Sequence, residues 1–169
     1  MIPHVIGLDL SLTATGIAHW NGTTSTLRPK STGDQRLVEI RNALTEHIAS
    51  AEIVIIEDLP PIRANALGLI GMVHGIVRVT CYDHARAFVL VPPASLKKYA
   101  TGKGNATKPD MRMALFQRTG LDLRDDNQVD AEWLRLMGLD ALGHPAVELP
   151  KAQREALAKV AWPEAVTVP

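Results

Sequence analysis

The stretch IVIIEDLPP, residues 53–61, combines a hydrophobic run, two acids and two prolines within nine positions. The apolar run from Ile53 to Ile56 is typical of a strand that is buried on both faces of a sheet. Glu57 and Asp58 follow directly, and the prolines end the strand. A carboxylate at the end of a buried strand is costly unless a positive charge lies beside it. The stretch therefore predicts a central strand and raises the question of what compensates Glu57.

Further elements follow on both sides of this strand. Apolar runs bounded by turn residues predict strands over 4–11, 15–22, 24–29 and 87–93. Asn21-Gly22 is expected as the turn that joins the second and third strands. Helical spacing of apolar residues predicts helices over 34–50, 65–84, 95–100, 108–118 and 127–142. This order predicts an α/β fold, a mixed five-stranded sheet with helices on both faces and with Trp20 and Trp133 in the core.

Length and composition indicate one globular domain. The chain has 169 residues, 46% hydrophobic and 21% charged, which is enough to bury a full core. We expect one domain over residues 1–145, followed by an extension over 146–169 that begins with a short amphipathic helix. The single cysteine indicates a reducing compartment, and we find neither a signal peptide nor an apolar stretch of membrane-spanning length. A cytoplasmic protein that does not enter membranes is expected.

Charge is balanced overall but unevenly distributed. Lysine plus arginine and aspartate plus glutamate both number 18, which argues against a generic nucleic-acid binder. Residues 97–118, however, carry six cations and one acid, whereas residues 122–132 carry five acids and one arginine. Such segments are often solvated surface, but a basic segment that runs directly into an acidic one is less readily explained as surface alone.

Two acids end predicted strands. Asp9 follows VIGL as Glu57 follows IVII, so both carboxylates would emerge at the same sheet edge if the strands are parallel neighbours. Each acid taken alone also fits a turn residue or a surface ion pair. The acidic stretch DDNQVDAEWL, residues 125–134, supplies a third group. Asp126 or Asn127 shares a helix face with Asp130, although one of residues 125–127 is also expected to cap the helix.

Clustered carboxylates predict a divalent cation site. Like charges a few ångströms apart raise one another's pKa, so such acids do not all stay ionised without a cation. Hard oxygen ligands without histidine or cysteine favour Mg²⁺, with Mn²⁺ as a substitute. Two such ions per site stabilise the attacking and leaving oxygens in phosphodiester hydrolysis.

Four blocks resemble one family. GLDLSLTATGIA (7–18), IVIIED (53–58), LKKYATGKGNATK (96–108) and DNQVDAEWL (126–134) are similar, in order and spacing, to the RuvC-type Holliday junction resolvases of the RNase H-like superfamily. The resemblance covers most of residues 4–142. It implies a homodimeric, Mg²⁺-dependent endonuclease that nicks four-way DNA junctions, with roles in DNA recombination and repair.

The resemblance also implies site residues. Asp9, Glu57 and Asp130 match the family's metal ligands. Counting back from Asp130 places the fourth acid on Asn127, but the neighbouring Asp126 is the residue we favour. Lys97 and Lys108 match the family's DNA-contacting lysines.

Chemistry supports these assignments. Lys108 would neutralise the scissile phosphate, and Lys97, Lys98 and Lys103 would bind neighbouring phosphates. The amides of the loop from Gly102 to Gly104 would allow close approach of a phosphate.

The chain also departs from the family pattern. No aromatic residue follows Glu57 closely, although Arg63 offers a guanidinium for stacking, and Ser11 replaces a usual glycine. These departures concern junction selectivity more than hydrolysis, and they suit a divergent member such as those of phages. The helix over 65–84 carries more apolar and small residues than one buried face requires, which fits either a core helix that covers the sheet or a two-fold interface. The resemblance favours the interface.

Two other functions remain as alternatives. A catalytically idle junction-binding module would keep the fold without the chemistry. An ATP-binding fragment of the actin or sugar-kinase type shares the first hairpin, but a chain of this length has no room for the second domain that such proteins need.

Overall fold

The protein is described here from a computed structural model that covers residues 2–59 and 65–163, with Asn65 and Ala66 described by their backbone alone. The prolines predicted to end the central strand, and Arg63, lie outside these ranges. Within them, no helix is both long and apolar enough to cross a bilayer.

The sheet is mixed and five-stranded, as the sequence predicts. Its order is β3-β2-β1-β4-β5. β2 is antiparallel to both of its neighbours, β1 and β3, whereas β4 and β5 continue parallel to β1. The bounds are β1 Val5–Asp9, β2 Thr15–Ala18, β3 Thr24–Leu27, β4 Ile53–Glu57 and β5 Ala87–Val91. The stretch quoted first is thus the central parallel strand between β1 and β5.

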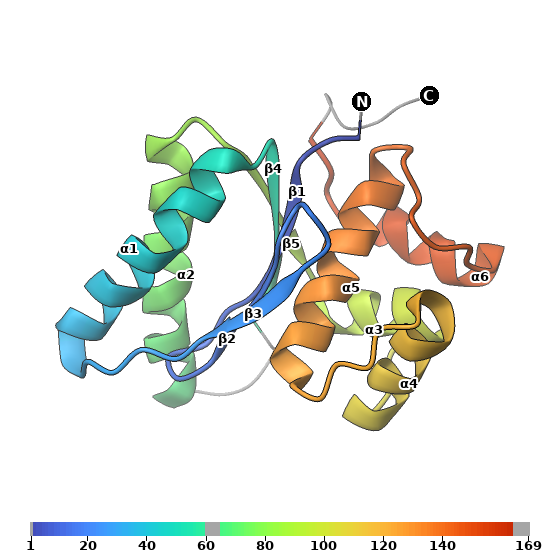
Figure 1. Cartoon of the computed structure of the whole chain (residues 1–169), viewed down its shortest axis with the longest axis horizontal. Coiled ribbons are helices and arrows are strands. Elements are labelled where there is room, and N and C mark those ends of the chain that lie inside the picture. Colours follow the sequence, from blue (N-terminus) through green and yellow to red (C-terminus); the bar gives the residue numbers. More distant parts are fainter. Residues whose placement is uncertain (1, 60–64, 164–169) are drawn as a thin grey trace.

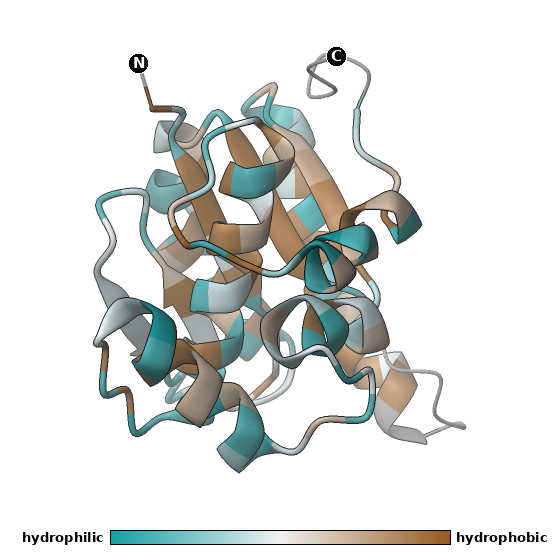
Figure 2. Ribbon diagram, turned by 90° about the vertical axis from the view of Figure 1, so that its right-hand side faces the viewer, coloured by the Kyte–Doolittle hydropathy of each residue, from teal (hydrophilic) through white to brown (hydrophobic). Residues whose placement is uncertain are grey.

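Helices cover both faces of the sheet (Figure 1). On one face lie α1 (Gly33–Ser50) and α2 (Asn65–Asp83), and on the other lies α5 (Asp126–Ala141). Outside α5 pack α3 (Pro93–Thr101), α4 (Lys108–Thr119), α6 (Lys151–Arg154) and the 3₁₀ turn η1 (Glu155–Lys159). Most strand residues of β1, β4 and β5 are hydrophobic, while the helices alternate between hydrophobic and hydrophilic residues (Figure 2). The chain therefore buries two cores, one on each face of the sheet.

Strand alternation assigns residues to these two cores. In β4, Ile53 and Ile55 face α5, whereas Val54 and Ile56 face α1 and α2. Because side chains alternate along a strand, Glu57 must project to the same side as Ile55. The same rule places Asp9 with Val5 on the α5 side of β1.

Asn21 and Gly22 lie in the turn between β2 and β3, as predicted, whereas two other local predictions are wrong. The hairpin between β2 and β3 has a three-residue loop, since the His19 amide donates to the Thr23 carbonyl at 2.8 Å and Gly22 takes a φ of 85°. Trp20, in that loop, is 47% exposed and stacks on His4 rather than lying in the core. The tail helix predicted over 150–162 is shorter, with one α-helical turn followed by the 3₁₀ turn.

The tail nevertheless packs closely on the domain. Arg154 donates to the buried Asp140 carboxylate at 2.6–3.1 Å, and the Tyr99 hydroxyl donates to the same group at 3.1 Å. The Gln153 side-chain amide donates to the Tyr99 carbonyl at 3.1 Å. These contacts hold the tail against α3 and α5, and the division of the chain at residue 145 stays a prediction.

Candidate functional site

Asp9 and Glu57 lie side by side at the carboxyl ends of two parallel strands. The register pairs Leu8 with Ile56, so Asp9 and Glu57 occupy the next equivalent positions on neighbouring strands. Adjacent strands lie about 4.8 Å apart, and both carboxylates project toward α5. The strand pattern thus brings two acids together that are 48 residues apart in sequence.

Glycines let α5 lie directly on the strands. A Cβ at Gly7 would stand 2.0 Å from the Ala131 carbonyl oxygen, and one at Gly16 would stand 1.9 Å from the Asn127 carbonyl oxygen. Only glycine permits such a close approach of a helix backbone to a sheet. Because Gly16 pairs with Asp9, the first turns of α5 are pressed against the strand end that carries Asp9. Asp130, on these turns, is therefore held at the same edge.

Asp125 anchors the amino terminus of α5 to the sheet. It is the N-cap residue and accepts a hydrogen bond from the Asn127 amide at 3.0 Å. Thr26 and Arg28 of the β3 segment donate to its other oxygen at 2.8 and 2.5 Å. Burial opposes ionisation, but these hydrogen bonds outweigh it and lower the pKa of Asp125 to about 2. Asp125 therefore has a structural role, and the helix presents the acids that follow it.

Lys108 supplies the positive charge beside the acids. The Thr107 side chain and Asp110 form a capping box at the start of α4, which fixes Lys108 in the first turn. Its ammonium group contacts the Asp130 carboxylate. Asp130 is 4% exposed, whereas Lys108 remains half exposed. Burial alone would lower the pKa of Lys108, but Asp130, Asp9 and Glu57 together raise it above its ordinary value.

The acids carry raised pKa values because burial and mutual repulsion exceed the available positive charge. Burial, and then the Asp130 carboxylate, raise the pKa of Asp9 to about 7. Burial, followed by Asp9 and Asp130, raises the pKa of Glu57 to about 8. The pKa of Asp130 is also raised, chiefly by burial, although Lys108 counteracts this. These shifts show that the carboxylates act on one another electrostatically.

Lysines therefore compensate Glu57 only in part. Lys108 and Lys97 both lower its pKa, yet the net pKa stays far above the ordinary 4.5. The surplus of hard oxygen donors fits a divalent cation in type and charge. Within the described ranges, however, no three His, Cys, Asp or Glu side chains are arranged to hold one ion between them. Ion binding would therefore require side-chain rotation, including withdrawal of Lys108 from Asp130.

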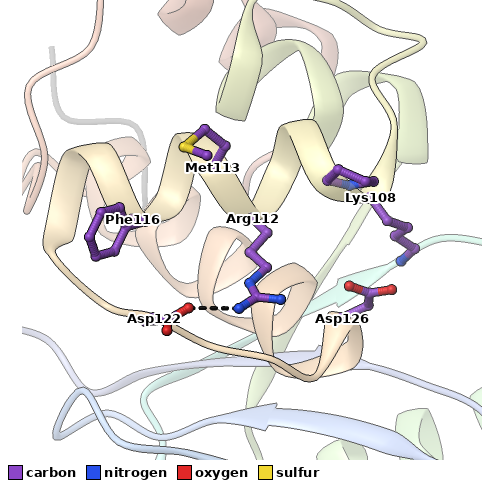
Figure 3. A pocket seen from close by; sticks show the side chains of 7 residues that line it. Lys108, Arg112, Met113, Phe116, Asp122 and Asp126 are labelled. Carbon is purple, nitrogen blue, oxygen red and sulfur yellow. Dashed lines mark hydrogen bonds and ion pairs between the residues drawn. The ribbon is translucent and has the colours of Figure 1, made fainter.

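Asp126 and Asn127 differ in their surroundings. The Asn127 side-chain amide donates to Asp125 at 2.8 Å, and its Cβ lies over Gly16. Asp126 lies close enough to Asp130 to raise the pKa of that residue. It also borders a surface hollow together with Lys108 (Figure 3). Asp126 therefore opens onto this hollow near Asp130, whereas the Asn127 side chain is held toward Asp125 and the sheet.

The other three lysines predicted to bind DNA differ in their surroundings. Lys97 is close enough to lower the pKa values of Glu57 and Asp130. Lys98 instead faces the tail, with its ammonium group 3.9 Å from Glu155. Lys103 is exposed on the loop after α3, next to Gly102, which ends that helix with a φ of 84°.

A feature that sequence reasoning missed lies beside the acids. A hollow of about 470 Å³, here called the α4 groove, lies between α4 and the segment leading into α5 (Figure 3). It is lined by Lys108, Pro109, Arg112, Met113, Phe116, Asp122 and Asp126. In the sequence of α4, the exposed apolar residues Met113 and Phe116 alternate with the buried Met111 and Leu115. Only the packing of α4 on the domain therefore shows which apolar side chains face outward.

Comparison with solved structures identifies the fold. No protein-family model and no curated protein matches the sequence. The structure titled "T. thermophilus RuvC in complex with Holliday junction substrate" matches with a TM-score of 0.66 and 21% identity, over 79% of this chain and 90% of that one. A second structure, "Thermus thermophilus RuvC structure", matches with a TM-score of 0.67 and 20% identity, over 85% and 99% of the two chains. The protein therefore has a RuvC-like fold of the RNase H-like type.

Proposed function

We propose that this protein is a divalent-metal-dependent endonuclease that nicks branched DNA, and that four-way (Holliday) junctions are its substrate. The observation that carries the proposal is the meeting of Asp9, Glu57 and Asp130 with Lys108 at one edge of the sheet. The RuvC-like fold supports it, because a protein of this fold has been solved with a Holliday junction.

Asp9, Glu57, Asp130 and Asp126 would hold Mg²⁺, or Mn²⁺ in its place, with two ions per site. When bound, such ions supply an activated water and offset the charge that develops on the phosphate during hydrolysis. Lys108 keeps its proton at neutral pH because the neighbouring acids raise its pKa. Its half-exposed ammonium group can therefore bind the phosphate that is cut.

The remaining lysines would bind the DNA backbone around this phosphate. Lys97 lies near the acids, and Lys103 extends the positive charge into the loop after α3. Lys98 would have to turn away from Glu155 to join them. Contacts of this kind set position and affinity but do not read sequence. Binding should therefore weaken steeply as salt concentration rises.

We further propose a homodimer formed through α2. Its outward side carries Leu69, Met72, Val79 and Tyr82, which are 53%, 45%, 59% and 83% exposed. A run of large apolar side chains on one helix is costly in water. A second copy would cover it and provide the two active sites that symmetric cleavage of a four-way junction requires. Light scattering on the wild type and on Tyr82→Glu should give dimer and monomer masses, and a monomeric wild type would refute the dimer.

Nicking assays on four-way, three-way and linear DNA test the main proposal. With Mg²⁺ or Mn²⁺, the wild type should nick the four-way junction and leave a 5′-phosphate and a 3′-hydroxyl. Asp9→Asn and Asp130→Asn should abolish nicking but retain junction binding. Asp34→Asn, an exposed acid in the first turn of α1, is the matched control and should nick normally.

Two results would contradict the proposal. Equal nicking by the wild type and Asp9→Asn would trace the activity to a contaminant. Junction binding by the wild type without cleavage in either metal would identify a catalytically idle binding module instead.

A further inference from the structure

The α4 groove has an apolar wall that the core does not use. Phe116 and Met113 are 50% and 56% exposed, whereas Met111 and Leu115 of the same helix are buried. The helix thus packs one side on the domain and presents the other to solvent. A half-exposed phenyl ring at the wall of a groove offers a flat stacking surface.

A polar pair lies in the same groove. The Arg112 guanidinium donates to Asp122 at 2.7 Å, and both side chains are more than one-third exposed. The pair presents hydrogen-bond donors directly beside carboxylate acceptors (Figure 3). An occupant with an apolar face and an edge of alternating acceptors and donors matches this arrangement. A nucleobase has these features.

The groove is continuous with the carboxylate site. Lys108 and Asp126 line its end, and Lys108 also contacts Asp130. Lys108, Arg112 and Phe116 follow one another at four-residue spacing, so the groove extends about 12 Å from the acids along α4. A strand whose phosphate lies at Lys108 can therefore place a base about two nucleotides away over Phe116.

We propose that the α4 groove binds one unpaired nucleobase of the cut strand, about two nucleotides from the phosphate held at the carboxylates. This inference rests on the proposed nuclease function and adds a specificity subsite to it. The base stacks on Phe116 and packs against Met113. Its edge pairs with Arg112 and Asp122.

The polar pair favours guanine. Arginine donates well to guanine O6 and N7, and the two oxygens of one carboxylate accept from guanine N1–H and N2–H. No other base offers two adjacent donors beside an acceptor. The subsite therefore selects a guanine that has left its pair near the branch point.

A fluorescence experiment on uncut DNA tests the subsite. Four-way junctions carry 6-methylisoxanthopterin, a fluorescent guanine analogue that keeps the carbonyl and N–H groups of the pairing edge, at single positions near the branch point. Binding is measured in EDTA so that the strand stays intact. The wild type should change the fluorescence at one position within the two nucleotides that flank the nick observed with Mg²⁺. Phe116→Ala should lose this signal and bind the junction about tenfold more weakly, while Phe116→Trp should keep the binding strength of the wild type.

Controls separate stacking from other effects. Val38→Ala removes a similarly exposed apolar side chain from α1, across the sheet, and should behave like the wild type. Among junctions with each natural base at the flanking position, guanine should bind most tightly, and Asp122→Asn should remove that preference. Equal binding of all four bases by the wild type would overturn the assignment of Arg112 and Asp122 as base-reading groups.

The outcomes also distinguish this subsite from the proposed function. Nicking by the wild type together with unchanged fluorescence and affinity in Phe116→Ala would overturn the subsite alone. A Phe116-dependent signal without nicking in Mg²⁺ or Mn²⁺ would support the subsite and overturn the nuclease proposal. A wild type that binds no junction would overturn both.

Discussion

Replacing Glu57 with glutamine should stabilise the metal-free protein, although Glu57 is a proposed metal ligand. Its pKa is raised from 4.5 to about 8, first by burial and then by Asp9 and Asp130. Between these pH values the folded protein holds a proton that the unfolded chain has released. The free energy of unfolding of the wild type must therefore fall as pH rises from about 4.5 to 8 and then level off. Glutamine keeps the size of the side chain and removes the charge, so this decline should shrink.

The size of the effect follows from the pKa shift. At 1.36 kcal/mol per pKa unit, the shift corresponds to a ceiling of about 5 kcal/mol. Glu57 is only partly buried, so solvent screens part of the repulsion, and we expect about 2–3 kcal/mol at pH 9. With a urea dependence of about 2 kcal/mol per molar, the unfolding midpoint of Glu57→Gln should lie about 1–1.5 M above that of the wild type. Below pH 4 the two midpoints should coincide.

Urea denaturation in EDTA at pH 4, 6, 7.5 and 9 measures this difference. Glu46→Gln, which changes an exposed glutamate of α1, is the matched control and should show no such pH dependence. A midpoint for Glu57→Gln at or below that of the wild type at pH 9 would refute the repulsion argument.

Two further substitutions test how the site is held. Gly16→Ala should cost about 1–3 kcal/mol of stability, because the new Cβ would lie 1.9 Å from the Asn127 carbonyl oxygen. Gly68→Ala is the control and should be neutral or stabilising, because its Cβ would meet nothing within 4 Å. Equal urea midpoints for the two variants would contradict the close packing of α5. Lys108→Met should lower stability by about 1–2 kcal/mol at pH 8, since it leaves the buried Asp130 without its cation. The loss should disappear in acid once Asp130 is protonated, and a loss that persists at pH 3 would point to packing instead.

Local sequence patterns were sufficient to predict that Asp9 and Glu57 lie at the same edge of the sheet. Asp9 and Glu57 each end an uninterrupted apolar run, and parallel strands bring such ends to the same edge. The position of Lys108 could also be predicted, because Thr107 and Pro109 mark the start of a helix. The strand-end acids and the helix-start residues are recognised from neighbouring residues alone. Once the parallel strands pair, the two acids must lie together.

Contacts between distant segments could not be predicted in this way. The role of Asp125 depends on Thr26 and Arg28, which lie nearly 100 residues earlier. The outward position of Phe116 depends on how α4 packs, because apolar residues occur on more than one side of this helix. Trp20 was misplaced because a hairpin loop with one additional residue carries it out of the core.

Mn²⁺ binding to the DNA-free protein tests most directly whether the acids form a metal site. Electron paramagnetic resonance records free Mn²⁺ during titration at pH 8, where most Asp9 side chains are ionised. The account predicts saturable binding by the wild type that is lost in Asp9→Asn and preserved in Asp34→Asn. Indistinguishable titrations of the wild type and Asp9→Asn would contradict it.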